Sequence, residues 1–283
     1  MKVEHSESET GMLTAVDGRR FQESPVSPRI CVAPARAMYV GPGLQLAPHL
    51  NVAATIAVAL AEPFQLRIWK ASTGWSEWRS AASALIPSET LHHLKSCGPM
   101  AFLYLDPLTD RRQPLTQAQL ESGRIHLQGA AQRIGIQGAF AGFGLQPKVP
   151  CDARIARVVQ EVERRPDAFG RLQEAAELAC LSPSRFRARF DAEVGLPFRR
   201  YRLWRRMALV MRAIAEGKSL TAAALEAGFS SSAHLSSSFK RMFGLSASEV
   251  IALGVAIDVS EDRVLSTPSA VQADREDRHT PAL

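Results

Sequence analysis

The chain has 283 residues, enough for two domains of ordinary size, and its 46% hydrophobic share allows a sizeable core. Its formal net charge is +6 and its sequence pI is about 9.4, which favours an anionic partner, either nucleic acid or a membrane surface. The longest apolar run, residues 52–61, is too short to span a bilayer, and the first residues lack the pattern of a secretory signal. These features predict a cytoplasmic protein with no membrane partner, so the basic charge points to nucleic acid.

The four cysteines show no paired spacing. They are Cys31, Cys97, Cys151 and Cys180, and none forms a Cys-x-x-Cys motif. No zinc or redox motif of that kind is therefore present, and reduced thiols of a cytosolic protein are expected, with a thiol sensor as the alternative. The sequence predicts no cofactor.

The N-terminal half divides into a leader and a strand-rich region. Residues 1–28 are polar and are expected to form a disordered leader. Between Arg29 and Asp106, short apolar runs are separated by Gly, Pro and Ser, which favours strands of a compact β domain. Residues 116–131 are expected to be helical, so this domain is assigned to 29–135. Glycines and prolines in residues 136–151 predict an interdomain linker.

The region 152–254 has helical periodicity throughout. Asp152 is expected to cap a helix that ends before Pro166. Ser182, followed by Pro183, is expected to cap a second helix that Gly195 ends. A long helix then runs from Pro197 to about Glu216, and two more follow, ending at Gly244. Residues 255–283 are rich in charge, Ser, Thr and Pro, and are expected to be a disordered tail.

The same five-residue pattern occurs twice in this helical region. Leu172, Ala176, Cys180, Leu181 and Ser182 recur 48 residues later as Leu220, Ala224, Gly228, Phe229 and Ser230. Helix, small residue, turn, polar cap and second helix are the parts of a helix-turn-helix unit, whose second helix enters a DNA major groove. The repeat predicts two such units joined by the long helix.

Residues 152–254 resemble the DNA-binding domain of the AraC/XylS family. The segment EAGFSSSAHLSSSFKRMFGLSASE is similar to the family signature, and LSPSRFRARF with Gly195, Pro197 and Tyr201 matches the first unit. Ala247, Val250, Cys180 and Ser237 depart from the usual residues of that signature, which puts the contacts of the second unit in doubt but not its fold. The resemblance implies a transcription regulator that contacts RNA polymerase and dimerises.

Base and phosphate contacts are expected from the second helix of each unit. In the first unit the candidates are Ser184, Arg185, Arg187, Ala188 and Arg189. In the second unit they are Ser232, Ala233, Ser236, Ser237, Lys240 and Arg241. Residues 164–212 hold 12 basic and 5 acidic residues, so most phosphate neutralisation is expected from the first unit and the long helix. The alternative is that these arginines form only a solvated face.

The resemblance implies a cupin-like N-terminal domain that senses an effector or dimerises. Leu85–Leu94 resembles the second cupin motif, with Pro87 and His92 in place and Glu89 where glycine is usual. The first cupin motif is missing and His49 is isolated, so no metal is expected. His92, His93 and Trp69 are weak candidates for effector contacts, although core packing is the more common role of a tryptophan.

The overall prediction is an α+β protein of two domains, a cupin-like β domain and an all-α domain with two helix-turn-helix units. We expect it to be a sequence-specific DNA-binding transcription regulator controlled by a small molecule, and not an enzyme. Two alternatives remain at this stage. One is a cupin-type enzyme or binding protein with a helical appendage, and the other is a DNA-binding protein without an effector.

Overall fold

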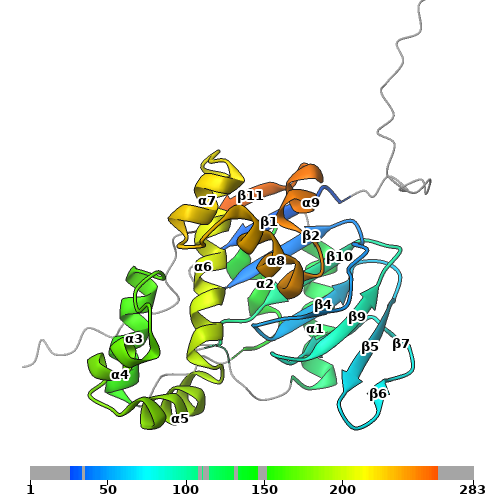
Figure 1. Ribbon diagram of the computed structural model, residues 1–283. Coiled ribbons are helices and arrows are strands. Elements are labelled where there is room, and N and C mark those ends of the chain that lie inside the picture. Colours follow the sequence, from blue (N-terminus) through cyan, green and yellow to red (C-terminus); the bar gives the residue numbers. More distant parts are fainter. Residues whose placement is uncertain are drawn as a thin grey trace, which may run out of the picture.

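The computed structural model describes residues 26–33, 36–107, 110, 115–130, 133–145 and 152–260. These residues form a strand-rich N-terminal domain and a helical C-terminal domain (Figure 1). The predicted α+β fold class with two domains is confirmed. The predicted leader lies outside the described residues, apart from its last three positions.

One sheet of the N-terminal domain has six strands in the order β11-β1-β2-β10-β4-β8. Their bounds are β1 (Arg29–Val32), β2 (Ala37–Gly41), β4 (Thr55–Ala59), β8 (Ser83–Ile86), β10 (Met100–Tyr104) and β11 (Ala256–Val259). Neighbouring strands are antiparallel, except that β11 runs parallel to β1.

A second sheet lies against the first. Its strands are β3 (His49–Leu50), β5 (Phe64–Lys70), β6 (Gly74–Trp75), β7 (Arg79–Ala81) and β9 (Leu91–Lys95). Alternate residues of both sheets point inward, as the period of two in a strand requires. Phe64, Leu66 and Leu94 meet Met100 and Phe102 in the core between the sheets.

Two helices cover the other face of the first sheet: α1 (Gln117–Ala130) and α2 (Ile136–Ala141). The predicted helix at 116–131 is thereby confirmed. Helix α2, however, occupies the start of the region predicted as a linker. Ile136, Phe140 and Phe143 are buried against the sheet, which explains why this glycine-rich stretch folds into the domain. Residues 146–151 of the predicted linker lie outside the described residues.

Strand β11 corrects the predicted tail. Ala256 donates a backbone hydrogen bond to Pro28, and Ser260 donates one to Val32, so β11 extends the N-terminal sheet beyond β1. Strand β11 is only four residues long, and it forms by pairing with β1, which lies more than 200 residues earlier in the sequence. Composition alone therefore did not reveal it. Residues 261–283 of the predicted tail lie outside the described part of the chain.

The C-terminal domain consists of helices. They are α3 (Ala153–Arg164), α4 (Leu172–Leu178), α5 (Pro183–Val194), α6 (Phe198–Ala215), α7 (Leu220–Glu226), α8 (Ser232–Phe243) and α9 (Ala247–Ala252). The helices predicted from periodicity and caps are confirmed. Helix α6 joins the two halves of the domain as one continuous rod (Figure 1).

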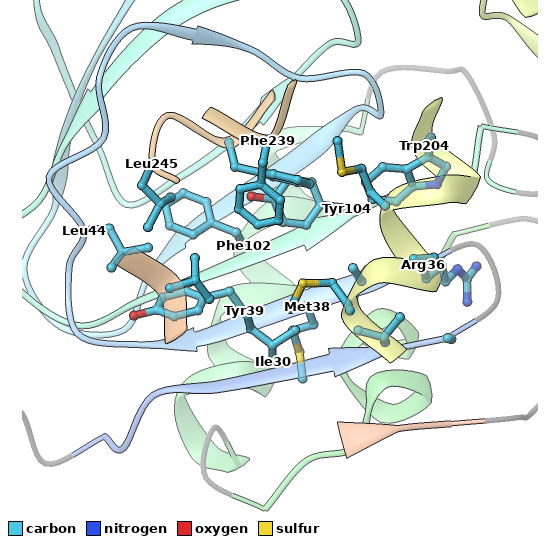
Figure 2. A pocket seen from close by; sticks show the side chains of 18 of the residues that line it. Ile30, Arg36, Met38, Tyr39, Leu44, Phe102, Tyr104, Trp204, Phe239 and Leu245 are labelled. Carbon is cyan, nitrogen blue, oxygen red and sulfur yellow. The ribbon is translucent and has the colours of Figure 1, made fainter. Parts of the chain in front are cut away.

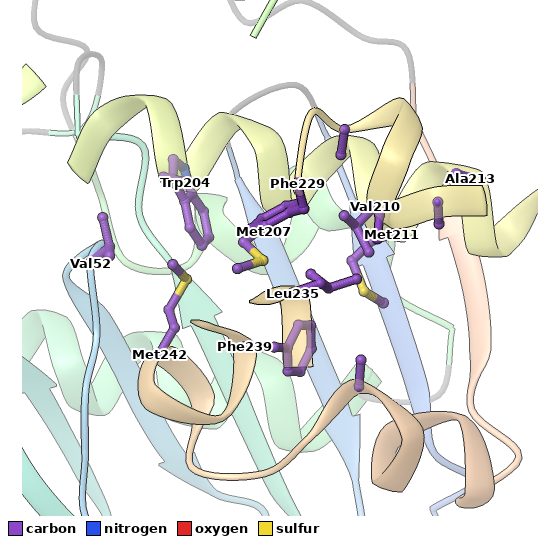
Figure 3. Close-up of a cluster of buried hydrophobic side chains, with 14 of the residues drawn as sticks. Val52, Trp204, Met207, Val210, Met211, Ala213, Phe229, Leu235, Phe239 and Met242 are labelled. Atoms are coloured by element: carbon purple, nitrogen blue, oxygen red, sulfur yellow. The ribbon is translucent and has the colours of Figure 1, made fainter. Parts of the chain in front are cut away.

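The two halves of the C-terminal domain pack differently. Helices α3, α4 and α5 enclose a core of their own around Phe186 and Phe190, to which α6 adds Tyr201. The second half shares its core with the N-terminal domain, because Val52 lies beside Trp204 and Met242 in one apolar cluster (Figure 3). The second half is therefore docked on the β domain, and the first half stands beside it (Figure 1).

Candidate nucleic-acid interface

Each half of the C-terminal domain forms a helix-turn-helix unit. In the first, Ser182 Oγ accepts from the Arg185 backbone N–H and Gly195 ends α5 with a φ of 85°. In the second, Ser231 Oγ accepts from the His234 N–H at 3.1 Å and Gly244 ends α8 with a φ of 80°. A serine cap and a left-handed glycine satisfy the backbone groups at the two helix ends.

The turn of the second unit is one residue longer than that of the first. Helices α4 and α7 begin 48 residues apart, whereas α5 and α8 begin 49 apart. The sequence comparison aligned Ser182 with Ser230, but the residue that caps α8 is Ser231. Arg187 of the first unit therefore corresponds to Ser236 of the second.

The predicted contact residues lie on the open faces of α5 and α8. In α5, Ser184, Arg185, Arg187, Ala188 and Arg189 are all exposed. In α8, Ala233, Ser237, Lys240 and Arg241 are exposed, whereas Ser232 and Ser236 are half-buried. The opposite face of each helix points into the core. It carries the buried side chains of Phe186 and Phe190 in α5 and of Leu235 and Phe239 in α8.

Residues 175–252 match the family model described as a helix-turn-helix domain. Together with the two capped units, this match decides the assignment. The C-terminal domain is an AraC-type helix-turn-helix domain. The match covers the second helix of both units and the whole of α6.

Three solved structures illustrate the likeness. ToxT from Vibrio cholerae O395 is 10% identical, with 77% of this chain and 98% of that chain covered and a TM-score of 0.49. The DNA-binding domain of AdpA, in complex with a target DNA, is 24% identical, covering 35% and 91%, with a TM-score of 0.33. The C-terminal domain of AraT from Geobacillus stearothermophilus is 16% identical, covering 42% and 94%, with a TM-score of 0.34. These scores are too low to transfer a function, and no curated protein matches the chain.

Asp152 holds one arginine of the AraC-type domain in place. Its carboxylate caps α3 and also accepts hydrogen bonds from Arg154 at 2.9 Å and from Arg189 at 2.8 Å. The hydrogen bonds from Arg154 are the main reason that the pKa of Asp152 lies well below its usual range. Arg189 is thus tied to α3, whereas Arg185 and Arg187 form no ion pair within the described part of the chain.

The arginines of α6 serve mainly internal contacts. Arg200 pairs with Glu89 at 3.0 Å, and Arg205 is buried beside Glu163 at 3.7 Å. Arg206 donates to the Ala227 carbonyl, and burial lowers the pKa of Arg202 and Arg206. These four side chains therefore have partners within the protein, and the phosphate neutralisation expected from the long helix stays a prediction.

The weak effector candidates lie on the second sheet. Trp69 is exposed, and His93 lies beside Trp78 with ring centroids 5.1 Å apart. His92 is buried and its ring contacts that of His49 at a tilt, with 4.2 Å between the ring centroids, because β3 pairs with β9. Sequence reasoning described His49 as isolated, since only strand pairing brings it to His92. Burial is the largest cause that lowers the pKa of His49 to about 3.

An apolar cavity lies elsewhere, between the two domains (Figure 2). It opens to solvent, and the space within it that a water-sized molecule can occupy is about 80 Å³. Its wall comes from the first sheet and from α6 and α8, and includes Met38, Tyr39, Phe102, Tyr104, Trp204, Met207, Ala208, Phe239 and Phe243. None of His92, His93 and Trp69 lines it. Sequence reasoning missed this cavity, because its walls are ordinary core residues of two domains.

Arg36 is the charged residue in the wall of this cavity. It forms a bidentate pair with the buried Asp110, with Nε 3.0 Å from Oδ2, and stacks on Phe140. Its charge is therefore balanced within the protein. Across the described residues, no group of three His, Cys, Asp or Glu side chains is arranged to hold a metal ion. Nor does any described helix combine the length and apolar composition needed to cross a bilayer.

Proposed function

We propose that this protein is a sequence-specific DNA-binding transcription regulator whose activity depends on a small apolar effector. The observation that carries the proposal is the pair of helix-turn-helix units with open second helices. A helix of this kind fits the major groove, and its exposed side chains meet base edges. The proposed readers are Ser184, Arg185, Arg187 and Ala188 in α5, and Ser232, Ala233, Ser236 and Ser237 in α8. Lys240, Arg241 and Arg189 are proposed phosphate contacts.

The two units are proposed to contribute unequally. Arginine can donate two parallel hydrogen bonds to guanine, worth about 1–3 kcal/mol of discrimination, whereas serine reads either partner weakly. Arg185 and Arg187 are exposed in the first unit, whereas the matching positions of the second unit hold His234 and Ser236. The first unit therefore supplies most of the sequence discrimination.

The proposed effector site is the interdomain cavity. Its wall is almost entirely apolar, and the one charged lining residue, Arg36, is already paired with Asp110. A free charge on a ligand would meet no unbalanced countercharge there, so we propose an uncharged, largely apolar molecule. Because the wall includes α6 and α8, such a molecule would favour the docked arrangement of the second unit by binding it selectively.

The remaining parts of the proposal follow from the AraC-type domain. The protein is proposed to act in the cytoplasm by binding rather than by catalysis, with RNA polymerase as a partner and a homodimer as the binding form. The domain boundaries at 29, 135 and 152 are also proposals, amended by the placement of α2 and β11 in the N-terminal domain.

The test is binding of the full chain to double-stranded DNA at several salt concentrations. A duplex enriched from a random-sequence library with the full chain serves as the specific site, and a scrambled duplex as the control. We expect affinity to fall steeply with salt on both, and the specific duplex to bind on the order of a thousandfold more tightly. No salt-dependent binding to either duplex would refute the proposal.

A further inference from the structure

The two halves of the C-terminal domain come close together at Asp167 and Gly228. The loop between α3 and α4 carries Asp167, and the turn between α7 and α8 carries Gly228. A Cβ added to Gly228 would lie only 3.3 Å from the Cβ of Asp167. The left-handed φ of 75° at Gly228 and this close approach both favour glycine there.

Arg206, near the middle of α6, occupies the junction. Its Nε donates to the Ala227 carbonyl at 2.6 Å, at the end of α7. Its guanidinium lies over the Phe229 ring, 4.0 Å from the centroid. Arg206 therefore binds the turn of the second unit from two sides, through the carbonyl before Gly228 and the ring after it.

The first unit reaches the same junction from the other direction. Arg202, one turn earlier on α6, donates from Nη2 to the Asp167 carbonyl at 3.4 Å. The charge of Asp167 also acts on both Arg202 and Arg206. Both arginines are half-buried, so water screens these interactions less than it screens a surface pair.

We propose that Arg206 is a positioning residue that fixes the spacing and angle between the two recognition helices. This inference rests on the proposed DNA-binding function. Helix α6 is about 27 Å long, comparable with the roughly 34–36 Å of one DNA turn, and it sets the approximate separation. The second unit already packs on α6 through the apolar cluster that holds Trp204, Val210 and Phe229. Arg206 adds a directional link to it, because its hydrogen bond and its ring contact hold the turn that leads into α8.

The consequence concerns the DNA site rather than affinity alone. One base pair inserted between two half-sites moves the second by about 3.4 Å and rotates it by roughly 35°. A rigid pair of readers cannot follow this shift, and so one of them loses its contacts. Without the Arg206 junction the second unit can adjust, at the cost of some affinity.

The experiment uses the enriched duplex and two derivatives, one with a base pair inserted and one with a base pair deleted between the half-sites. We expect the full wild-type chain to lose at least about tenfold in affinity on each derivative, in line with the cost of a lost base contact. Arg206→Met keeps an apolar chain over Phe229 and removes the hydrogen bond and the charge. We expect it to bind the original duplex more weakly and to lose less than about threefold on the derivatives.

Arg199→Ala is the matched control, because Arg199 is exposed on the same helix. Like Arg206→Met, it removes one positive charge, so its affinity for DNA can fall. The ratio of its affinities for the original duplex and for the two derivatives should stay at the wild-type value. Melting curves establish that each variant is folded, and Arg206→Lys replaces Arg206→Met if the latter does not fold. A lysine keeps the charge without the planar group.

The outcomes separate this inference from the proposed function. If the folded Arg206 variant keeps the wild-type ratios of affinity between the duplexes, the role of Arg206 is overturned and the proposed DNA binding stands. Absence of wild-type binding to every duplex would instead overturn the proposed function. A reduced spacing penalty in the Arg206 variant, with an unchanged penalty in Arg199→Ala, would support the inference.

Discussion

Cys180 and Gly228 occupy the same position in the two helix-turn-helix units, and both have a left-handed backbone, with φ of 52° and 75°. Glycine adopts this conformation without a steric cost, whereas a residue with a Cβ is strained by roughly 1–2 kcal/mol. The first unit therefore keeps the geometry of the turn at an energetic cost that the second avoids.

Replacing Cys180 by glycine should stabilise the protein. We expect Cys180→Gly to raise the free energy of unfolding by about 1 kcal/mol, because it relieves the strain and removes only an exposed thiol. Urea unfolding followed by circular dichroism measures the change. Gly228→Ala is the converse variant and should destabilise by about 1–2 kcal/mol, because it introduces the same strain. A Cys180→Gly protein less stable than wild type would contradict this account.

Removing Arg187 should weaken specific DNA binding. We expect Arg187→Ala to reduce affinity for the enriched duplex by about 5- to 150-fold, the equivalent of 1–3 kcal/mol for a bidentate base contact. Fluorescence anisotropy at constant salt measures it. Arg79→Ala is the control, since it removes the same charge from an exposed position on β7. Equal affinities of Arg187→Ala and Arg79→Ala would reject the assigned role.

Glu89 combines backbone strain with an interdomain ion pair. Its φ is 57°, and its Oε2 lies 3.0 Å from Arg200 Nε at the start of α6. Glu89→Ala removes the pair and keeps the strain, whereas Glu89→Gly removes both. We therefore expect Glu89→Gly to be more stable than Glu89→Ala by about 1 kcal/mol. The melting temperatures of the two variants give the comparison, and the reverse order would show that the backbone there is unstrained.

The buried pair of His49 and His92 should make stability depend on pH. Burial lowers the pKa of both, and that of His49 falls to about 3. Between pH 6.5 and 3 the unfolded chain therefore binds a proton that folded His49 does not, so stability falls as the pH falls. The slope is up to about 1.4 kcal/mol per pH unit for each such group.

Urea unfolding at pH 7 and pH 5 measures this dependence. His49→Gln should flatten it by removing one of the two groups. His126→Gln, at an exposed position on α1, should leave the slope as in wild type. A wild-type slope that persists in His49→Gln would show that other groups carry the dependence.

Filling the interdomain cavity should abolish ligand binding there. Ala208 lines the cavity from α6, and Ala208→Phe places a ring in the space. We expect the uncharged probe N-phenyl-1-naphthylamine to bind wild type, raising its fluorescence and the melting temperature, and to do neither in the variant. Ala222→Phe, on the exposed face of α7, is the control. Undiminished probe binding by Ala208→Phe would remove the cavity as the effector site.

The C-terminal helices could be predicted from sequence because their signals are local. Ser182 with Pro183 starts α5, Gly195 ends the same helix and Gly244 ends α8, and each signal acts within one turn. The repeat of these signals identified two helix-turn-helix units without any tertiary information. One error, Ser230 in place of Ser231 as the second cap, arose in a turn whose extra residue has no periodic signature, and the short helix α9 was not predicted.

Tertiary structure decided the features that depend on distant partners. Strand β11 forms because β1 offers a free edge, and His49 meets His92 because β3 pairs with β9. The arginines of α6 are charged in the sequence, yet only their neighbours Glu89, Glu163 and Ala227 show that they hold the fold together. The periodicity and the caps of a helix depend on residues that are close in sequence, whereas the partners of a side chain in another domain depend on how the chain packs.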